Sequence, residues 1–159
     1  MKYILPFLLL YFASSCASTQ ANERHATSYS QDYIEKTGAL SVDQTVLKLE
    51  EIIAAKKDVG MKLFAIIDHK AGATSVNLEL NDAKVIIFGN PNVGTKLMQA
   101  NPKLALELPM KILVYEEDGI THIRYKDPLV WGRHLATTMS PLLLKISGLL
   151  NNITDAATK

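Results

Sequence analysis

Apolar residues occur along this chain either in continuous runs or at helical spacing, and these two patterns predict a succession of strands and helices. A weak strand pattern, SYSQDYIEK, occupies residues 28–36. Valine, leucine and isoleucine then recur at helical spacing over residues 42–57, which predicts an amphipathic helix. Ser41 and Gln44 stand directly before this pattern and have the spacing of a capping box, so they predict where the helix begins.

Longer apolar runs predict four further strands. The run MKLFAII at 61–67 is uninterrupted, which is typical of a central strand covered on both faces, and AKVIIF at 83–88 is of the same kind. Residues 109–117 and 120–126 predict two more strands, and Asp118-Gly119 between them predicts a hairpin turn.

A small polar residue stands directly before proline at four places, and each pair predicts the start of a helix. The polar side chain accepts from the free backbone N–H groups of the first turn, and proline suits the first helical position because it lacks an N–H. The pairs are Asn90-Pro91, Asn101-Pro102, Asp127-Pro128 and Ser140-Pro141. The stretch FGNPNVGTK therefore predicts a strand that leaves through Gly89, a cap at Asn90 and a helix over 91–100.

The same stretch is similar to a nucleotide-binding phosphate loop, but it departs from that pattern at the lysine and hydroxyl positions that contact the phosphates and magnesium. The loop needs a lysine directly after its second glycine, to reach the phosphates, and then a hydroxyl for magnesium. Here Thr95 follows Gly94, and Lys96 comes one place later. We therefore expect no nucleotide ligand, because turn and cap chemistry explains the glycines.

The first residues predict export and attachment to lipid. The apolar run YILPFLLLYFA at 3–13 is much shorter than the roughly 20 residues that span a bilayer, and it matches the core of a signal peptide. Small residues lead into Cys16, the single cysteine, in a pattern similar to a bacterial lipoprotein cleavage box. This predicts a signal peptide over 1–15 and an acylated Cys16. The alternatives are an ordinary signal peptide cleaved nearby, or a buried free cysteine.

Charge and composition limit the classes of partner that we expect this chain to bind. The chain of 159 residues has 17 basic and 16 acidic side chains, so it has no basic surplus for nucleic acid. Residues 16–27 are small and polar and predict a tether, and residues 28–136 have the length of one domain. The tail, 137–159, predicts a C-terminal amphipathic helix with few basic residues, which favours packing on the domain or on a second copy over lying on a membrane.

Three blocks of sequence resemble the bacterial domain-of-unknown-function family 302 (DUF302) in order and spacing. They are FAIIDHKAGA (64–73), VIIFGNPNVGTKLMQANP (85–102), and LELPMKILVYEEDG (106–119) with RYKDP (124–128). The resemblance implies an α+β fold, a two-layer sandwich in which a mainly antiparallel sheet of four to five strands packs against helices. It also implies frequent homodimers and no established activity. The positions it marks here are Asp68, His69, Gly89, Asn90, Pro91, Gly94, Thr95 and Met98.

The candidate site consists of polar groups at strand ends. Asp68 and His69 follow the strand at 61–67, and Asn90 follows the strand at 83–88. Loops at strand ends are where binding groups gather, so we expect a pocket between these ends and the helix that starts at Pro91. The ligand-binding candidates are Asp68, His69, Asn90, Thr95 and Met98, with Gly89, Pro91 and Gly94 as structural turn residues.

His69 allows other interpretations. As a metal or haem ligand it would need partners such as His122, His134, Met98 or Asp68, and none stands at ligand spacing. As a general base it would need an orienting carboxylate and a nucleophile. The structural interpretation is that Asp68 caps a short helix and His69 forms local hydrogen bonds.

Together these observations predict an uncharacterised envelope lipoprotein that is a non-catalytic module for a small ligand or a partner. It would face the periplasm from the outer membrane in a bacterium with two membranes. The alternative is a small metal- or haem-binding protein or enzyme that uses His69. The expected partners are the membrane through Cys16, an unknown small ligand and a second copy of the chain. No cofactor is identified, and neither nucleic acid nor nucleotide is expected.

Overall fold

A computed structural model describes residues 32–135 and 140–159 of the chain. The predicted signal peptide over 1–15, the acylated Cys16 and the tether over 16–27 lie outside the described residues and stay predictions.

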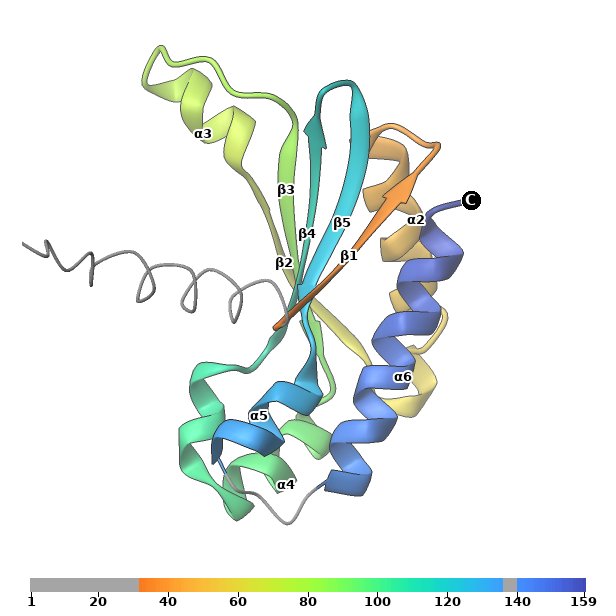
Figure 1. The fold of residues 1–159 in the computed structure, drawn as a ribbon, viewed down its shortest axis with the longest axis vertical. Coiled ribbons are helices and arrows are strands. Elements are labelled where there is room, and N and C mark those ends of the chain that lie inside the picture. The colour runs from red at the N-terminus through yellow and green to blue at the C-terminus, as the bar shows by residue number, and fades with distance from the viewer. Residues whose placement is uncertain (1–31, 136–139) are drawn as a thin grey trace, which may run out of the picture. The chain divides into compact units, whose positions relative to one another are not determined.

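Five antiparallel strands form one sheet in the order β1-β5-β4-β3-β2 (Figure 1). They are β1 (Tyr33–Gly38), β2 (Lys62–Asp68), β3 (Ala83–Gly89), β4 (Met110–Glu117) and β5 (Ile120–Lys126). The predicted α+β fold with a mainly antiparallel sheet is therefore confirmed. The hairpin is also confirmed, because Asp118 and Gly119 have φ angles of 52° and 76°, the left-handed conformation of a tight hairpin turn.

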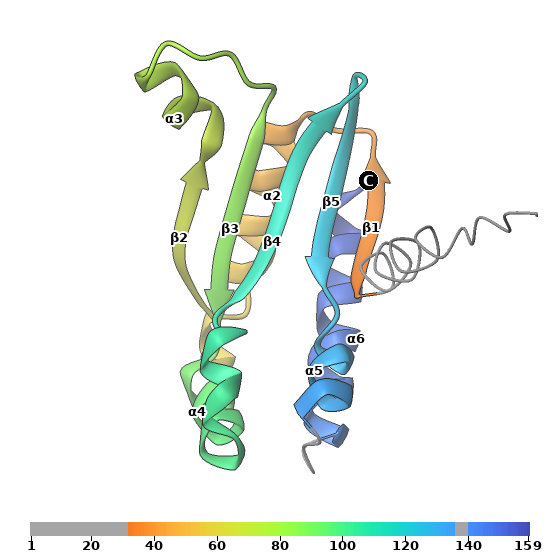
Figure 2. The same ribbon diagram turned by 60° about the vertical axis from the view of Figure 1, so that its left-hand side comes forward.

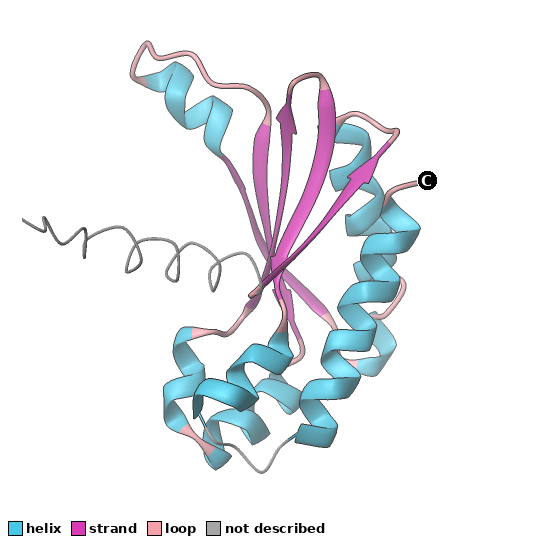
Figure 3. Cartoon of the chain, viewed as in Figure 1, coloured by secondary structure: helices cyan, strands magenta, loops and turns pink. Residues whose placement is uncertain are grey.

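Two helices cover one face of the sheet, and shorter helices extend its two ends (Figures 2 and 3). The helices are α2 (Val42–Ala54), α3 (His69–Ser75), α4 (Pro91–Ala100), α5 (Pro128–Leu135) and α6 (Ser140–Ala157), with 3₁₀ turns η1 (Lys57–Val59) and η2 (Pro102–Leu106). Helices α2 and α6 pack on the covered face, whereas α3 lies at one end of the sheet and α4 and α5 at the other (Figure 1). None of the described helices is long and apolar enough to cross a membrane.

The core lies between the covered face and helices α2 and α6. Alternate residues of the three inner strands point into it and are almost completely buried, namely Ile86, Phe88, Ile112, Val114 and Ile123. Leu49 of α2, with Leu143 and Leu150 of α6, packs against them. The intervening strand residues, such as Val85 and Leu113, point to the opposite face and are partly exposed. Within the described residues, helices thus cover one face of the sheet and leave the other face open.

Strand β2 corrects one prediction. The run at 61–67 is not a central strand, because among the described strands β2 forms an edge of the sheet and pairs with β3 alone. Leu63, Phe64 and Ile67 are 39%, 51% and 44% exposed. A continuous apolar run shows that a strand is apolar but does not show which strands lie beside it. The pairing of the strands made this run an edge strand.

The predicted helix starts are confirmed where the structure describes their side chains. The caps accept as expected: Asn90 from the Asn92 N–H at 3.0 Å, Asn101 from the Lys103 N–H at 3.1 Å, and Asp127 from the Leu129 N–H at 3.0 Å. The capping box of Ser41 and Gln44 is present, although its helix ends at Ala54 and a 3₁₀ turn follows. Helix α4 spans 91–100 as predicted.

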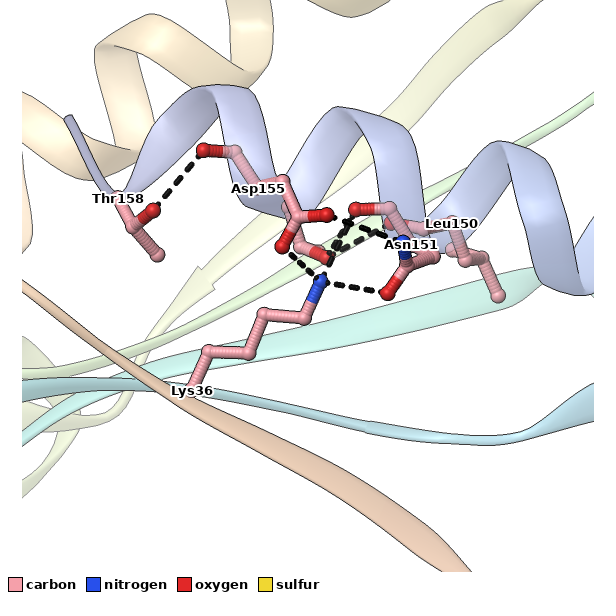
Figure 4. A network of polar contacts seen from close by, with 6 residues as sticks. Lys36, Leu150, Asn151, Asp155 and Thr158 are labelled. Carbon is pink, nitrogen blue, oxygen red and sulfur yellow. Dashed lines mark hydrogen bonds and ion pairs between the residues drawn. The ribbon is translucent and has the colours of Figure 1, made fainter.

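Helix α6 is fastened to β1 by a single lysine (Figure 4). The Lys36 ammonium donates to the backbone oxygen of Asn151 at 3.0 Å and to its Oδ1 at 2.9 Å, and it contacts the Asp155 carboxylate at 2.5 Å. This hydrogen bond holds the pKa of Asp155 below its usual value. Because Leu143 and Leu150 are each 1% exposed, the apolar side of this helix packs on its own domain.

Candidate functional site

Asn90 fixes the start of α4 against the turn that precedes β2. Its Oδ1 caps the helix, and its Nδ2 donates to the backbone oxygen of Val59 at 2.7 Å. Gly60, beside Val59, has a φ of +88°, and a Cβ there would lie 3.1 Å from the Asn90 Nδ2. Glycine is therefore required at position 60 both for its left-handed backbone and for the close approach of the asparagine.

A cavity of about 400 Å³ lies beside this helix start, and we call it the Thr95 cavity. It is lined by Phe64, Gly89, Asn90, Pro91, Gly94, Thr95, Met98, Leu108 and Pro109. Six of the eight positions marked by sequence are among them. The structure thus brings together the candidates from the second sequence block, and adds Phe64 from β2 and Leu108-Pro109 from the segment before β4.

Asp68 and His69 lie at the opposite end of the sheet. Strands β2 and β3 are antiparallel, so Asp68 pairs with Lys84 whereas Gly89 pairs with Lys62. Along β2, six residue steps lead from Lys62, the partner of Gly89, to Asp68, which corresponds to about 20 Å. The prediction of one pocket between the two strand ends is therefore wrong, because two consecutive antiparallel strands finish at opposite ends of the sheet.

Asp68 has the role that the structural interpretation predicts. Its Oδ1 accepts from the Ala71 N–H at 2.8 Å and caps α3, and its Oδ2 lies 3.2 Å from the Lys84 ammonium. The cap hydrogen bond first, and then Lys84, lowers the pKa of the Asp68 carboxyl below its usual value. His69 follows as the exposed first residue of α3. Within the part of the chain that the structure describes, no three His, Cys, Asp or Glu side chains could hold a metal ion together.

A polar cluster on the open face was not predicted from sequence. Glu35 of β1 accepts from the Tyr115 hydroxyl at 2.6 Å, lies 3.1 Å from the His122 Nδ1, and forms an ion pair with Arg124. The Tyr115 and His122 rings stack with centroids 5.0 Å apart. The only available signal is the alternation of His122 and Arg124 along β5, since the partners depend on strand order.

The contacts within this cluster shift the pKa values of Glu35 and Tyr115. The hydrogen bond from Tyr115 first, and the Arg124 guanidinium next, lower the pKa of Glu35 below its usual value. Desolvation and the same hydrogen bond raise the pKa of Tyr115 to about 12. A carboxylate with these donors and a phenol that stays protonated are poor proton carriers near neutral pH. The cluster fastens the edge strand β1 to β5 and β4.

A second cavity of about 350 Å³ lies on the other side of the α4 start, between α4, α6 and the covered face, and we call it the Lys145 cavity. Its walls are Val59, Met61, Phe88, Gly89, Asn90, Val93, Gly94, Leu97, Leu108, Met110, Leu142, Ile146, Leu149 and Leu150, with Lys56 and Lys145. Gly89, Asn90, Gly94 and Leu108 line both cavities, so the two adjoin along the first turn of α4.

Comparisons with known proteins agree with this fold. The family described as "Domain of unknown function DUF302" matches residues 34–156, which extends the sequence resemblance through α6. The crystal structure of an uncharacterized conserved DUF302 protein from Bacillus stearothermophilus superposes with a TM-score of 0.70 at 18% identity, covering 79% of this chain and 98% of that one. The matched domain makes up almost all of that crystallised chain, and here the described residues from 32 onward belong to one compact unit.

Curated relatives share part of the chain. The fluoride-specific ion channel FluC 1 of Brucella suis biovar 1 (strain 1330) is 39% identical over 89 residues, which are 55% of this chain and 34% of that protein. FluC 2 of Brucella melitensis biotype 1 (strain ATCC 23456 / CCUG 17765 / NCTC 10094 / 16M) is equally similar, with 32% of its length covered. The chain thus spans about a third of the length of these relatives.

Proposed function

The chain belongs to the DUF302 family, and from that premise we propose that it is a non-catalytic module that binds a small, largely apolar ligand in the Thr95 cavity. The observation that carries the proposal is that six marked positions from the start of α4 line one cavity together with Phe64 of β2 and with Leu108 and Pro109. Its volume, about 400 Å³, is typical of small-molecule pockets.

The lining supports a ligand with one polar group. Phe64, Met98, Leu108 and Pro109 contribute apolar walls, and the Thr95 side chain contributes a hydroxyl. Gly89 keeps the space open, because a Cβ there would lie 3.5 Å from the Phe64 ring and 3.8 Å from Pro109. Met98 has a flexible thioether that adapts to ligands of different shape.

Methionine-methyl NMR on residues 31–159 tests the proposal. Met98 lines the Thr95 cavity, so a panel of small cyclic alcohols and ketones should include compounds that shift its methyl signal. Thr95→Val keeps the shape but removes the hydroxyl, and it should weaken those compounds severalfold. Thr74→Val, in α3, is the matched control and should leave the titration unchanged. A Met98 signal that no compound moves would contradict the proposal.

We also propose that the module works in the cell envelope, anchored through an acylated Cys16. The apolar run at 3–13, the small residues before Cys16 and the polar segment after it support this. Cells producing the full chain should incorporate radiolabelled palmitate into the wild type and not into Cys16→Ser. Equal labelling of the two proteins would refute lipid attachment.

Pairing with a second copy is proposed through the edge strand β2. Its outer side pairs with no strand of the described residues, and the side chains of Leu63, Phe64 and Ile67 are exposed. Two copies could therefore continue the sheet across a two-fold axis. Sedimentation of residues 31–159 should give a dimer that Ile67→Lys dissociates. Leu106→Lys, at a residue 85% exposed in η2, should leave the dimer intact. A wild-type protein that stays monomeric at high concentration would contradict this interface.

A second candidate function rests on the relatives named fluoride-specific ion channels. Because the match covers about a third of those proteins, we propose that it corresponds to an appended binding domain, and that this chain serves a membrane transport system in the same way. Deletion of the gene should then raise the sensitivity of its host to fluoride, and re-expression should restore resistance. An unchanged growth response to fluoride would remove this candidate.

A further inference from the structure

We propose that the Lys145 cavity is a separate binding site for a medium-length acyl chain that ends in a carboxylate. The site lies on the covered side of α4 and adjoins the Thr95 cavity, with which it shares Gly89, Asn90, Gly94 and Leu108. Its apolar walls fit the chain, and its two lysines fit the negative end.

The walls come from three directions. Phe88 and Met110 belong to the covered face of the sheet, Val93 and Leu97 to α4, and Leu142, Ile146, Leu149 and Leu150 to α6. Such a lining offers an alkyl chain contact on all sides but offers a polar molecule few hydrogen bonds. Each methylene transferred from water into these surroundings should strengthen binding about fourfold.

The charges that line this cavity all have one sign. Among the residues that the structure describes, its ionisable lining consists of Lys56 and Lys145, without an aspartate or glutamate. Lys145 is exposed and Lys56 is half-buried, which places both ammonium groups within reach of solvent, where a charged head group would stay hydrated.

These two lysines also differ from four other lysines of the domain, which form ion pairs. Lys36, Lys70, Lys84 and Lys126 each contact a carboxylate of the protein within 3.2 Å. For Lys56 and Lys145, no side-chain hydrogen bond or ion pair is formed with any residue in 32–135 or 140–159. A bound carboxylate would supply the counter-charge, and because the lysines are accessible, their main effect is selectivity for anions over neutral chains.

The size of the cavity sets the length of the chain. A volume of about 350 Å³ lies at the lower end of the range for small-molecule sites, which suits a chain of about ten carbons. Decanoate, used below its micellar concentration, is therefore the probe. Decanol and decyltrimethylammonium share its chain length and differ in head-group charge, and hexanoate shares its head group but lacks four methylenes.

Isothermal titration calorimetry of residues 31–159 should rank decanoate first. Hexanoate should bind roughly 250-fold more weakly, since it lacks four methylenes and each costs about fourfold. Decanol should bind severalfold more weakly than decanoate, and decyltrimethylammonium more weakly still. The double variant Lys56→Gln/Lys145→Gln should abolish the preference of decanoate over decanol. Lys96→Gln, at an exposed lysine of α4 outside both cavities, should retain it.

Methionine-methyl NMR separates this site from the Thr95 cavity. Met61 and Met110 line only the Lys145 cavity, and Met98 lines only the Thr95 cavity. Shifts of Met61 and Met110 on addition of decanoate support the proposal, whatever the response of Met98 to the alcohols and ketones. Shifts confined to Met98, no shift at all, or equal affinities of the wild type for decanoate and decanol would overturn it.

Discussion

Gly94 offers the sharpest test of the idea that the start of α4 is shaped for binding. It occupies the interior of α4, where glycine costs about 0.5–1 kcal/mol relative to alanine because of its backbone entropy. A Cβ at this position would meet only the Leu108 Cδ1, at 3.7 Å, which is an ordinary contact. Gly94→Ala should therefore stabilise the domain by about 1 kcal/mol, or raise its Tm by about 4 °C.

Gly148→Ala provides the matched control. Gly148 also lies inside a helix, α6, and a Cβ there would have no atom within 4 Å, but it lines neither cavity. Urea unfolding should show a similar gain for both variants, because both remove the same entropic cost. Ligand titration should separate them, since only the methyl group at position 94 projects between the two cavities and should weaken binding there severalfold.

Two results would refute this reasoning about Gly94. If Gly94→Ala destabilised the domain, the glycine would have a conformational role that its surroundings do not explain. If both alanine variants bound every probe as the wild type does, then the space beside residue 94 would not be used for binding, and a glycine that weakens the helix would have no functional reason.

Four further predictions concern other contacts. The folded-state pKa of Glu35 is lowered from 4.5, so the contribution of this carboxylate to stability is present above about pH 4.5 and is lost as the pH falls through the folded-state pKa. Below about pH 4.5, acidification should therefore change the urea midpoint of Glu35→Gln less than that of the wild type. Leu97→Ala, at a side chain with no exposure, should lower the free energy of unfolding by about 2–5 kcal/mol, and a loss below 1 kcal/mol would mean that α4 packs loosely. Asn90→Ala loses both the cap and the hydrogen bond to Val59 and should cost about 2 kcal/mol. Asn90→Ser keeps a capping oxygen, places no acceptor against the Val59 carbonyl and should cost less, and equal losses would show that the cap contributes nothing. His69→Ala should leave the metal content of the purified protein and its ligand titrations unchanged, and a loss of bound metal on this substitution would restore the metal-site hypothesis.

The sequence alone predicted the features whose hydrogen bonds close within a few residues. The Asn90 cap, the extent of α4 over 91–100, the Asp118-Gly119 turn and the Asp68 cap were all predictable. In each case the partner of a side chain or backbone group is two or three residues away, so no knowledge of distant segments was needed. The apolar runs likewise indicated strands, and the family resemblance implied the α+β class.

Which segments meet was decided only by the tertiary structure. The apolar run of β2 gave no sign that it would lie at an edge, and nothing local indicated that antiparallel pairing would put Asp68 far from Asn90. Glu35 meets Tyr115 and Arg124 only because β1 pairs with β5, at the far end of the sequence. Strand order and register arise from the burial of many side chains at once, so they are properties of the assembled core and cannot be read from any one segment.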